Sequence, residues 1–258
     1  MGTNLTAETH SSTPLWVRRL AHGVVDAYNA VVVALQPPWT PGPAVPELFE
    51  IAERARSLSD ISDHLVPLYY ETLELAPKLI VELGVRGGES TFVFERVARR
   101  TGAALVSVDL EDCSKVLDYP RWNFVRADDI EFSQRFPDWC REKQLPAEID
   151  ALFIDTSHVY EHTLQEMKSW LPWVGARGKV FFHDTNQRRF YWRRNGTAGL
   201  GWWNERGVIR AIEDYFGRRF DERRDFVDAA GGWMIRHTST CSGLTILSRI
   251  PGADGSGR

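Results

Sequence analysis

The chain has 258 residues, a formal net charge of −4 and a composition that is 43% hydrophobic and 26% charged. This length suits one α/β domain with a full core and a modest extension, and the composition is that of an ordinary globular protein. The slightly acidic balance provides no basic surface for nucleic acid. No apolar run reaches the ~18 residues of a membrane span, so we expect neither nucleic acid nor membrane as a partner.

The cysteines and the first residues indicate the cellular compartment. The N-terminal residues are mostly polar and lack the basic-then-apolar order of a secretory signal. Cys113, Cys140 and Cys241 are scattered and odd in number, which fits a reducing compartment better than a disulfide framework. We therefore expect a cytoplasmic protein.

Residues 1–75 are expected to form a helical extension with a linker ahead of the main domain. Apolar residues recur at near-helical spacing across Pro14–Gln36. A proline-rich stretch follows and is typical of a stiff linker, and Pro46–Ala55 and Asp63–Leu75 are again helical in pattern. Residues 1–13 are expected to be disordered. The helices are expected to cover the side of the main domain on which a substrate would bind.

From residue 76 to about residue 250 the sequence alternates between short apolar runs and amphipathic segments. The expected strands are Leu79–Leu83, Ala104–Val108, Asn123–Arg126, Ile149–Ile154, Lys179–Phe182, Asp225–Asp228 and Leu244–Ser248. The expected helices are Glu89–Arg100, Ile130–Lys143, Glu161–Leu171 and Gly207–Phe216. Repeated βα units predict an α/β, Rossmann-like fold with a mostly parallel seven-stranded sheet and helices on both faces. Residues 251–258 are expected to be a disordered tail.

A glycine-rich loop follows the first of these strands. It reads E-x-G-x-x-G-G, with Glu82 at the strand end, then Gly84, Gly87 and Gly88, and with Ser90 and Thr91 in the helix that follows. Glycines let a backbone approach a ligand closely. The pattern differs from the G-x-G-x-x-G that seats a pyrophosphate, and an acidic strand end suits a cationic ligand. S-adenosylmethionine (SAM), with its sulfonium and amino groups, fits Glu82 better than NAD does.

Two further acidic residues follow the next two strands. Asp109 ends the second strand, where a carboxylate can accept hydrogen bonds from both ribose hydroxyls. Asp128 follows the third and is placed to meet the adenine amino group. With the glycine loop, this series resembles the class I SAM-dependent methyltransferases over about Leu75–Ile250. Another ligand in a nucleotide-binding fold stays an alternative.

A second constellation follows the fourth and fifth strands. Asp155 and His158 lie after the fourth strand, and His183 and Asp184 end the fifth. Adjacent strand ends lie about 5 Å apart, so the two aspartates could converge on one cation. Carboxylate oxygens favour Mg²⁺ or a similar ion, which would lower the pKa of a bound hydroxyl. His158 is then placed to take the proton as general base.

This spacing resembles the metal-dependent sugar O-methyltransferases of natural-product pathways, including the rhamnosyl and TDP-rhamnose O-methyltransferases of the calicheamicin type. The resemblance implies that Asp155 and Asp184 are metal ligands and that His158 is the base. Relatives usually carry Glu where this chain has His183, so His183 is a candidate third ligand or orients a water. The acceptor implied is a deoxysugar hydroxyl, on a nucleotide-sugar or on a natural product already glycosylated.

Ordinary structural roles and rival functions stay open for these residues. Asp155 is also a good helix N-cap, Asp184 a common turn residue and His158 an ordinary loop histidine. The letters H-x-x-E-H from His158 to His162 match an inverted zinc-peptidase motif, although they straddle a loop and a helix. A non-catalytic SAM-binding assembly protein, and an iron oxygenase that uses His158, His183 and Asp184, are the rivals from other classes.

Residues 188–206 interleave arginines with aromatic residues and then glycines. Arginine forks suit a diphosphate, and aromatic rings can stack on a base or a sugar. The segment is therefore a candidate lid over a nucleotide-sugar acceptor. Tryptophan, tyrosine and arginine are equally typical of protein interfaces, so the same residues could be a contact in a homo-oligomer, which we expect this protein to form.

Overall fold

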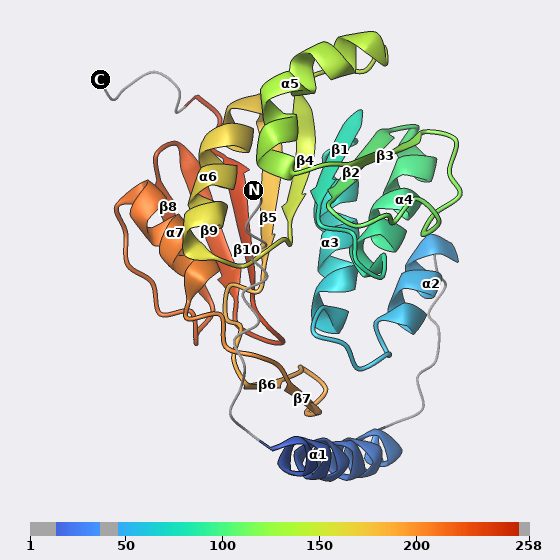
Figure 1. Ribbon diagram of the computed structural model, residues 1–258, viewed down its shortest axis with the longest axis vertical. Helices are drawn as coiled ribbons and strands as arrows, with labels where there is room; N and C mark the ends of the chain where they lie inside the picture. Colours follow the sequence, from blue (N-terminus) through green and yellow to red (C-terminus); the bar gives the residue numbers. More distant parts are fainter. Residues whose placement is uncertain (1–13, 37–45, 253–258) are drawn as a thin grey trace, which may run out of the picture.

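The computed structural model describes residues 14–36 and 46–252, and its centre is one eight-stranded sheet. The strand order is β3-β2-β1-β4-β5-β10-β9-β8 (Figure 1). The first five are parallel: β1 (Leu79–Leu83), β2 (Ala104–Asp109), β3 (Trp122–Arg126), β4 (Ile149–Ile154) and β5 (Val174–His183). The last three are antiparallel to their neighbours: β10 (Leu244–Arg249), β9 (Trp233–Thr238) and β8 (Phe226–Ala230).

Helices cover both faces of the sheet, as the repeated βα units predict. One face packs against α2 (Pro46–Arg54), α3 (Leu65–Leu73) and α4 (Glu89–Thr101). The other packs against α5 (Asp129–Glu142), α6 (Tyr160–Trp170) and α7 (Gly207–Phe216). All five residues of β1 are buried, because a strand covered on both faces carries apolar residues without alternation. The Rossmann-like fold class is thus confirmed.

The sheet has one strand more than the sequence predicts. The missing strand is β9, whose side chains alternate between buried and more exposed because it belongs to the antiparallel end of the sheet. A separate hairpin pairs β6 (Phe190–Trp192) with β7 (Ala198–Leu200). It lies within the arginine-rich segment, for which the sequence predicts no strands.

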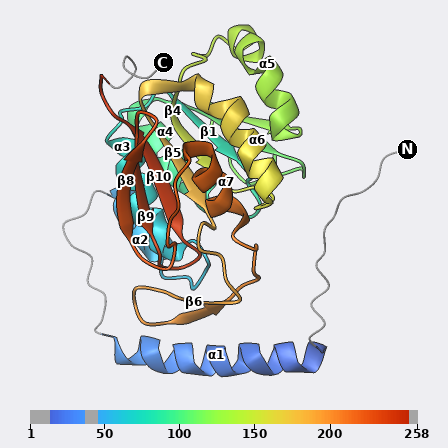
Figure 2. The same ribbon diagram turned by 90° about the vertical axis from the view of Figure 1, so that its left-hand side faces the viewer.

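The N-terminal helices form close to where their patterns place them. The first is α1 (Leu15–Leu35), and the third begins with a 3₁₀ turn at Ser62–His64 ahead of α3. In Figure 2, α1 lies apart from the sheet and its covering helices, next to the β6–β7 hairpin. The expectations for residues 1–13, for the linker prolines at 37–45 and for the end of the tail at 253–258 fall outside the described residues.

The topology brings the carboxyl ends of β1, β2, β4 and β5 to one edge of the sheet. Ligands of open α/β sheets bind at this edge, beyond the strand ends. Each of the loops that carry the acidic and histidine residues leaves the sheet here. Among the helices of residues 14–36 and 46–252, none is both long and apolar enough to cross a bilayer.

Candidate active site

A cavity of about 490 Å³ opens along this edge of the sheet. Its walls come from the loops that follow β1, β2, β3 and β4, with one side chain contributed by the segment before α7. The lining residues are Gly84, Arg86, Val108, Asp109, Leu110, Glu111, Ala127, Asp129, Asp155, Thr156, Ser157, His158, His162 and Trp202. The size fits a small organic ligand, and the floor combines carboxylates with two histidines.

The glycine loop is held in place by close backbone contact. Gly84 has φ +89°, and a Cβ at this position would lie 2.1 Å from the carbonyl oxygen of Asp155. Gly88, with φ +78°, is the N-cap of α4, and its Cβ would lie 2.2 Å from Val116. Only glycine fits both demands, so the loop can lie directly against the end of β4. At Gly87 a Cβ would meet nothing within 4 Å.

Glu82 lies beneath this loop and not in the cavity wall. Its carboxylate is fully buried and accepts hydrogen bonds from Ser90 Oγ at 2.6 Å, from Ser107 Oγ at 2.7 Å and from Thr91 Oγ1. Burial raises the pKa of Glu82 to about 7, although these three hydroxyls oppose the shift. Glu82, Ser90 and Thr91 therefore brace the loop from within, where the sequence predicts direct contact with a ligand.

Asp109 both lines the cavity and ties the glycine loop to β2. Its Oδ2 accepts hydrogen bonds from the backbone N–H groups of Val85 at 2.8 Å and Arg86 at 3.2 Å. Asp128, in contrast, is the N-cap of α5, where its side chain accepts from the Glu131 N–H at 2.9 Å. The neighbouring Asp129 reaches the cavity instead, so the acidic residue available after β3 is one position later than the sequence predicts.

Asp155 and His158, which line the cavity, meet the buried Asp184 behind its wall. The Nε2 atom of His158 lies 2.9 Å from Asp155 Oδ1 and 2.9 Å from Asp184 Oδ2. Ligand-type atoms of these three residues all lie within 4.8 Å of one another. The two strand ends therefore converge as their spacing predicts. Asp155 is not the N-cap of α6, which is Val159, and His158 is partly buried. Asp184 does open a turn, since its carbonyl accepts from the Gln187 N–H at 3.3 Å, but its side chain belongs to the cluster.

His183 completes this cluster from the buried side. Its Nδ1 lies 3.3 Å from Asp155 Oδ1 and 3.2 Å from Asp184 Oδ1, and the residue is only 2% exposed. Within the described part of the chain, neither ring nitrogen of His183 nor Oδ1 of Asp184 has a hydrogen-bond partner. Buried polar atoms without partners are costly. His183 Nδ1 and Asp184 Oδ1 lie at ion-pair distance but make no hydrogen bond, and this arrangement beside two carboxylates suits a bound divalent cation.

The charges of the cluster also favour a bound cation. Burial lowers the pKa of His158, but its hydrogen bonds to Asp155 and Asp184 outweigh burial and raise this pKa to about 10. The same carboxylates raise the pKa of His183 to about 9. Burial alone would raise the pKa of Asp155, yet the two imidazoles hold it well below its usual range. The carboxylate pair thus demands positive charge, which protonated histidines or a metal ion can supply.

The backbone is strained at two of these residues. His158 has φ +59° and Asp184 has φ +56°, although neither is glycine. Such conformations cost of the order of 1–3 kcal/mol and persist where the surroundings impose them. These backbone conformations direct the side chains of His158 and Asp184 toward each other. Backbone strain of this kind is typical of functional sites.

A second polar cluster, which the sequence does not predict, forms the other end of the cavity. His162 Nε2 lies 3.1 Å from Asp129 Oδ1 and 3.6 Å from Glu166 Oε1, and Thr156 donates to Glu166 at 2.6 Å. Burial, and next the charge of Asp129, raise the pKa of Glu166 to about 8. His158 and His162 thus belong to different clusters, so the H-x-x-E-H letters do not form a zinc-peptidase site.

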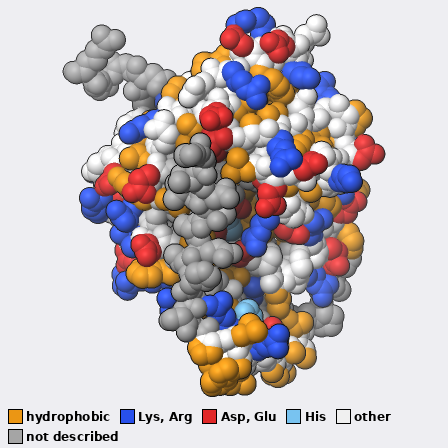
Figure 3. All heavy atoms as spheres, in the orientation of Figure 1, with side chains coloured by type: hydrophobic (Ala, Val, Ile, Leu, Met, Phe, Trp, Pro, Cys, Tyr) orange, Lys and Arg blue, Asp and Glu red, His pale blue; other side chains and the backbone are white. Residues whose placement is uncertain are grey.

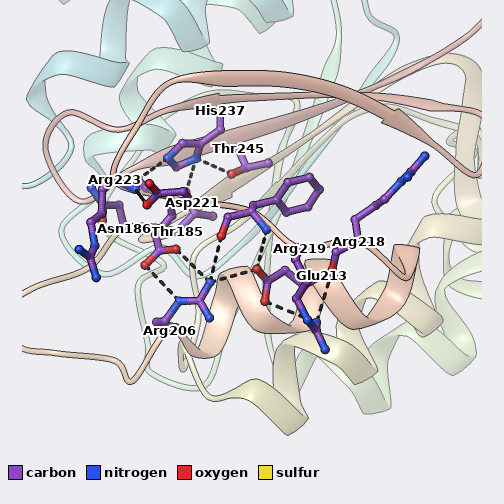
Figure 4. A network of polar contacts seen from close by, with 12 residues as sticks. Thr185, Asn186, Arg206, Glu213, Arg218, Arg219, Asp221, Arg223, His237 and Thr245 are labelled. Carbon is purple, nitrogen blue, oxygen red and sulfur yellow. Dashed lines mark hydrogen bonds and ion pairs between the residues drawn. The ribbon is translucent and has the colours of Figure 1, made fainter.

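Several arginines of residues 188–206 make internal ion pairs. Arg206 pairs with Glu213 and Glu222, each at 3.0 Å, and Arg188 pairs with Glu222 at 3.0 Å. Figure 4 shows Arg206 pointing toward Glu213, and His237 next to Thr185 and Thr245. These guanidinium groups fasten the segment to α7 and the loop that follows it. They are not available to grip a diphosphate.

Arg193 is also structural, because it is 5% exposed and donates to the backbone carbonyls of Leu58, Ser59 and Ala198. Trp202 is the member of the segment that reaches the cavity. Its ring lies edge-on to His158, with 5.5 Å between the ring centroids. The segment expected to form a lid is therefore a hairpin anchored to the body, followed by Trp202 beside the cluster of Asp155, His158 and Asp184.

The site residues coincide with a recognisable domain. Residues 81–185, which run from β1 to the end of β5, match a family described as a methyltransferase domain. This part of the chain is therefore similar to methyltransferase domains. The matched span contains the glycine loop, Asp109 and the cluster of Asp155, His158 and Asp184, so the matched region and the cavity share the same loops.

Curated relatives of the methyltransferase domain include a rhamnosyl O-methyltransferase of Mycobacterium tuberculosis. The two sequences are 32% identical over 127 residues, which is 46% of this chain and 50% of the relative. The same similarity extends to the protein of that name from Mycobacterium bovis. The match thus spans about half the length of these relatives.

Two solved structures show the same fold. The SAH-bound Podospora anserina methyltransferase PaMTH1 superposes with a TM-score of 0.51 at 15% identity, over 93% of this chain and 98% of that one. MycE, a methyltransferase from the mycinamycin biosynthetic pathway solved with Mg, SAH and mycinamycin VI, gives a TM-score of 0.51 at 18% identity, over 84% of this chain and 58% of MycE. At these identities the likeness extends to the fold alone.

Proposed function

We propose that this protein is a SAM-dependent O-methyltransferase that acts on a hydroxyl group of a sugar. The observation that carries the proposal is the convergence of Asp155 and His158, which line the cavity, with the buried Asp184. A carboxylate pair with an adjacent imidazole can orient and deprotonate a hydroxyl. The methyltransferase domain surrounding it provides the place for the methyl donor.

The cavity suits the cofactor along its length. Gly84 would allow close approach of a ligand. Asp109 would meet the ribose through Oδ1, which also accepts from the Glu111 N–H at 2.9 Å, and Asp129 with His162 would face the adenine. SAM bound there would supply an activated methyl group. Glu82 supports the site indirectly, because it fixes the loop that forms the cavity wall. Asp128 is engaged as a helix cap and is left out of the proposed contacts.

Asp155 and Asp184 are the proposed ligands of a divalent cation, with His183 as a third donor on the buried side. Their oxygen-rich character favours Mg²⁺. The cation would lower the pKa of a hydroxyl bound to it and compensate the carboxylate charge that otherwise keeps His158 protonated. His158 accepts the hydroxyl proton at Nε2. The strained backbone at His158 and Asp184 keeps both groups aligned, so positioning contributes much of the rate.

A sugar is the proposed acceptor because the curated relatives carry the name rhamnosyl O-methyltransferase. The internal ion pairs of Arg188 and Arg206 remove two candidate diphosphate contacts, while Arg189 and Arg194 are exposed. The narrower resemblance, to TDP-rhamnose O-methyltransferases of calicheamicin type, stays a prediction, as do antibiotic biosynthesis and the cytoplasmic location.

The deciding experiment is turnover of isotope-labelled SAM against a panel of TDP-deoxysugars and rhamnosyl glycosides, with and without EDTA. We expect methyl transfer to at least one sugar, loss of transfer with EDTA and recovery with Mg²⁺. Asp155→Asn should lose transfer, while Asp150→Asn, which changes an aspartate at the opposite end of β4, should keep it. SAM binding without turnover on any acceptor would indicate a non-catalytic assembly protein.

One rival has a specific observation in its favour. His158, His183 and Asp184 come together, and two histidines with one carboxylate are the donors of non-haem iron oxygenases. Oxygen uptake by the iron-loaded protein, without methyl transfer, would establish that rival. Methyl transfer that requires Mg²⁺ and consumes no oxygen would exclude it.

A further inference from the structure

Helix α1 contacts the rest of the described chain along one side only. Tyr28 Oη donates to Gly196 O at 3.0 Å, and Gln36 Nε2 donates to Asn195 O at 2.9 Å. Asn29 exchanges two hydrogen bonds with the backbone of Ala198, at 2.8 and 2.9 Å. All of these partners belong to the β6–β7 hairpin. The 21-residue helix is therefore docked on the hairpin in a fixed orientation.

A row of large apolar side chains runs along another side of α1. Trp16, Leu20, Val24, Val31 and Leu35 are 69%, 62%, 62%, 60% and 80% exposed. We call these five residues the apolar stripe. Their spacing of four, four, seven and four residues keeps them on one face of a helix. In Figure 3, hydrophobic side chains gather at the lower end of the molecule, where α1 lies.

The stripe has the character of a contact surface. The charged residues of α1 are Arg18, Arg19 and Asp26, and at 100° per residue none of them falls within the arc of the stripe. Asn29, which faces the hairpin, lies on a different side of the helix from the centre of the stripe. A charge-free arc that faces away from its own domain differs from the usual amphipathic helix, whose apolar side faces the core. Contiguous exposed apolar surface of this kind marks an interaction site.

We propose that the apolar stripe of α1 packs against the apolar stripe of a second copy of this chain, forming a two-fold symmetric dimer. A straight row along a six-turn helix is self-complementary, as a two-fold interface requires. Five side chains of this size expose on the order of 500 Å² per copy, so two copies bury about 1,000 Å², which reaches the lower limit for a biological interface. A helix lying on a bilayer would instead carry several basic residues on its polar face. In α1 the opposite side is occupied by the hairpin.

The position of α1 gives the dimer a relation to the cavity. The β6–β7 hairpin follows β5, whose end carries His183 and Asp184, and α1 lies on the far side of that hairpin (Figure 1). Pairing through α1 therefore places the interface beyond the hairpin, away from the end of β5. This inference does not depend on the proposed reaction, because it rests on exposure and packing alone.

Sedimentation velocity over a concentration series tests the proposal. We expect the wild-type protein to sediment as a dimer and Leu20→Lys/Val24→Lys/Val31→Lys to sediment as a monomer with an unchanged circular dichroism spectrum. Val227→Lys, which charges a valine 68% exposed on the edge strand β8, should remain a dimer. A monomeric wild type, or a triple variant that still dimerises, overturns the proposal.

Cysteine cross-linking provides a second measurement should the triple variant fail to fold. The three native cysteines are buried, so an introduced surface cysteine reports on the stripe alone. At least one of Leu20→Cys, Val24→Cys and Val31→Cys should form an intermolecular disulfide under mild oxidation, while Val227→Cys should not. No cross-link at any stripe position overturns the proposal. Co-flotation of a monomeric wild type with phosphatidylcholine–phosphatidylglycerol vesicles also overturns it, in favour of a membrane surface.

Discussion

The side-chain amide of Asn204 donates a hydrogen bond to the backbone carbonyl of Asp184 at 2.9 Å. The two residues are 20 positions apart, and Asn204 is only 7% exposed. The bond holds the end of β5 at the point where Asp184 takes its left-handed backbone conformation. Asn204 is therefore a positioning residue for the carboxylate that the proposed cation requires.

Asn204→Ala should weaken the site without removing any group that touches a substrate. Residues that orient metal ligands typically contribute roughly 10- to 100-fold to metal affinity, and we expect a loss of this size for Mg²⁺ or Mn²⁺. Titration of Mn²⁺ followed by electron paramagnetic resonance measures it directly. High Mg²⁺ should then restore turnover, since the ligands themselves are intact.

The matched control is Asn123→Ala, because Asn123 also donates its amide to a backbone carbonyl, that of Arg121 at 3.4 Å, away from the cavity. It should leave Mn²⁺ affinity unchanged. If Asn204→Ala binds Mn²⁺ as tightly as the wild type, the hydrogen bond has no positioning role.

His158→Ala should abolish most of the turnover while SAM still binds. A positioned general base contributes typically 10²- to 10⁴-fold, and we expect kcat to fall within this range. Calorimetry measures SAM affinity, and the labelled-methyl assay measures kcat. His22→Ala changes an exposed histidine of α1 and should leave both unchanged. Near-full activity of His158→Ala would remove His158 as the base.

Much of the fold is readable from the sequence because buried parallel strands are continuous apolar runs. Leu79–Leu83 and Ile149–Ile154 come close to such runs, with one acidic residue in each, Glu82 and Asp150, and both appear at the predicted bounds. The antiparallel strand β9 escapes this signal, because Arg236 and His237 interrupt its apolar residues. Its position is marked only by the turn glycines Gly231 and Gly232, both with positive φ.

The site is predictable to the extent that it follows strand ends. Asp155, His158 and Asp184 come directly after strands, so their convergence follows from the topology. Asp129 and His162 lie on different helices, α5 and α6, and their contact depends on how those helices pack. No local pattern records that packing. The prediction that arginines of residues 188–206 bind a diphosphate fails for a similar reason. The ion-pair partners of Arg188 and Arg206, Glu213 and Glu222, come later in the chain.

Gly84→Ala should destabilise the protein by more than the conformational cost alone. The φ of +89° disfavours any side chain, and the added Cβ would lie 2.1 Å from the backbone oxygen of Asp155, so β1 and β4 must move apart. Gly102→Ala is the matched control, because Gly102 has φ +74° but open space around its Cβ position. We expect about 1–2 kcal/mol for the control and clearly more for Gly84→Ala, measured by urea unfolding.

SAM affinity should separate the two variants further. The movement forced by Gly84→Ala displaces Asp155 and the cavity wall, so SAM binding should fall, whereas Gly102→Ala leaves the cavity untouched. Equal unfolding free energies for the two variants would show that the loop does not need this close approach.

The burial of Glu82 predicts that the free energy of unfolding depends on pH. Burial raises the pKa of Glu82 to about 7 in the folded protein, compared with about 4.3 in an unfolded chain. The folded state therefore binds the proton more tightly than the unfolded state does. This contribution is fully present below the unfolded pKa and is lost as the pH rises through about 7, at up to ~1.4 kcal/mol per pH unit.

Glu82→Gln should remove this dependence, since an amide cannot titrate. The unfolding free energy of the wild type should fall by on the order of 3 kcal/mol between about pH 4.5 and pH 7 from this one group, and the fall should be smaller in the variant by a comparable amount. Urea unfolding at pH 5 and at pH 7.5 measures the difference. Glu131→Gln, at an exposed position in α5, is the control and should keep the wild-type slope. If Glu82→Gln retains that slope as well, the carboxylate of Glu82 is ionised across the range, held so by Ser90, Thr91 and Ser107, and burial is the lesser influence on its pKa.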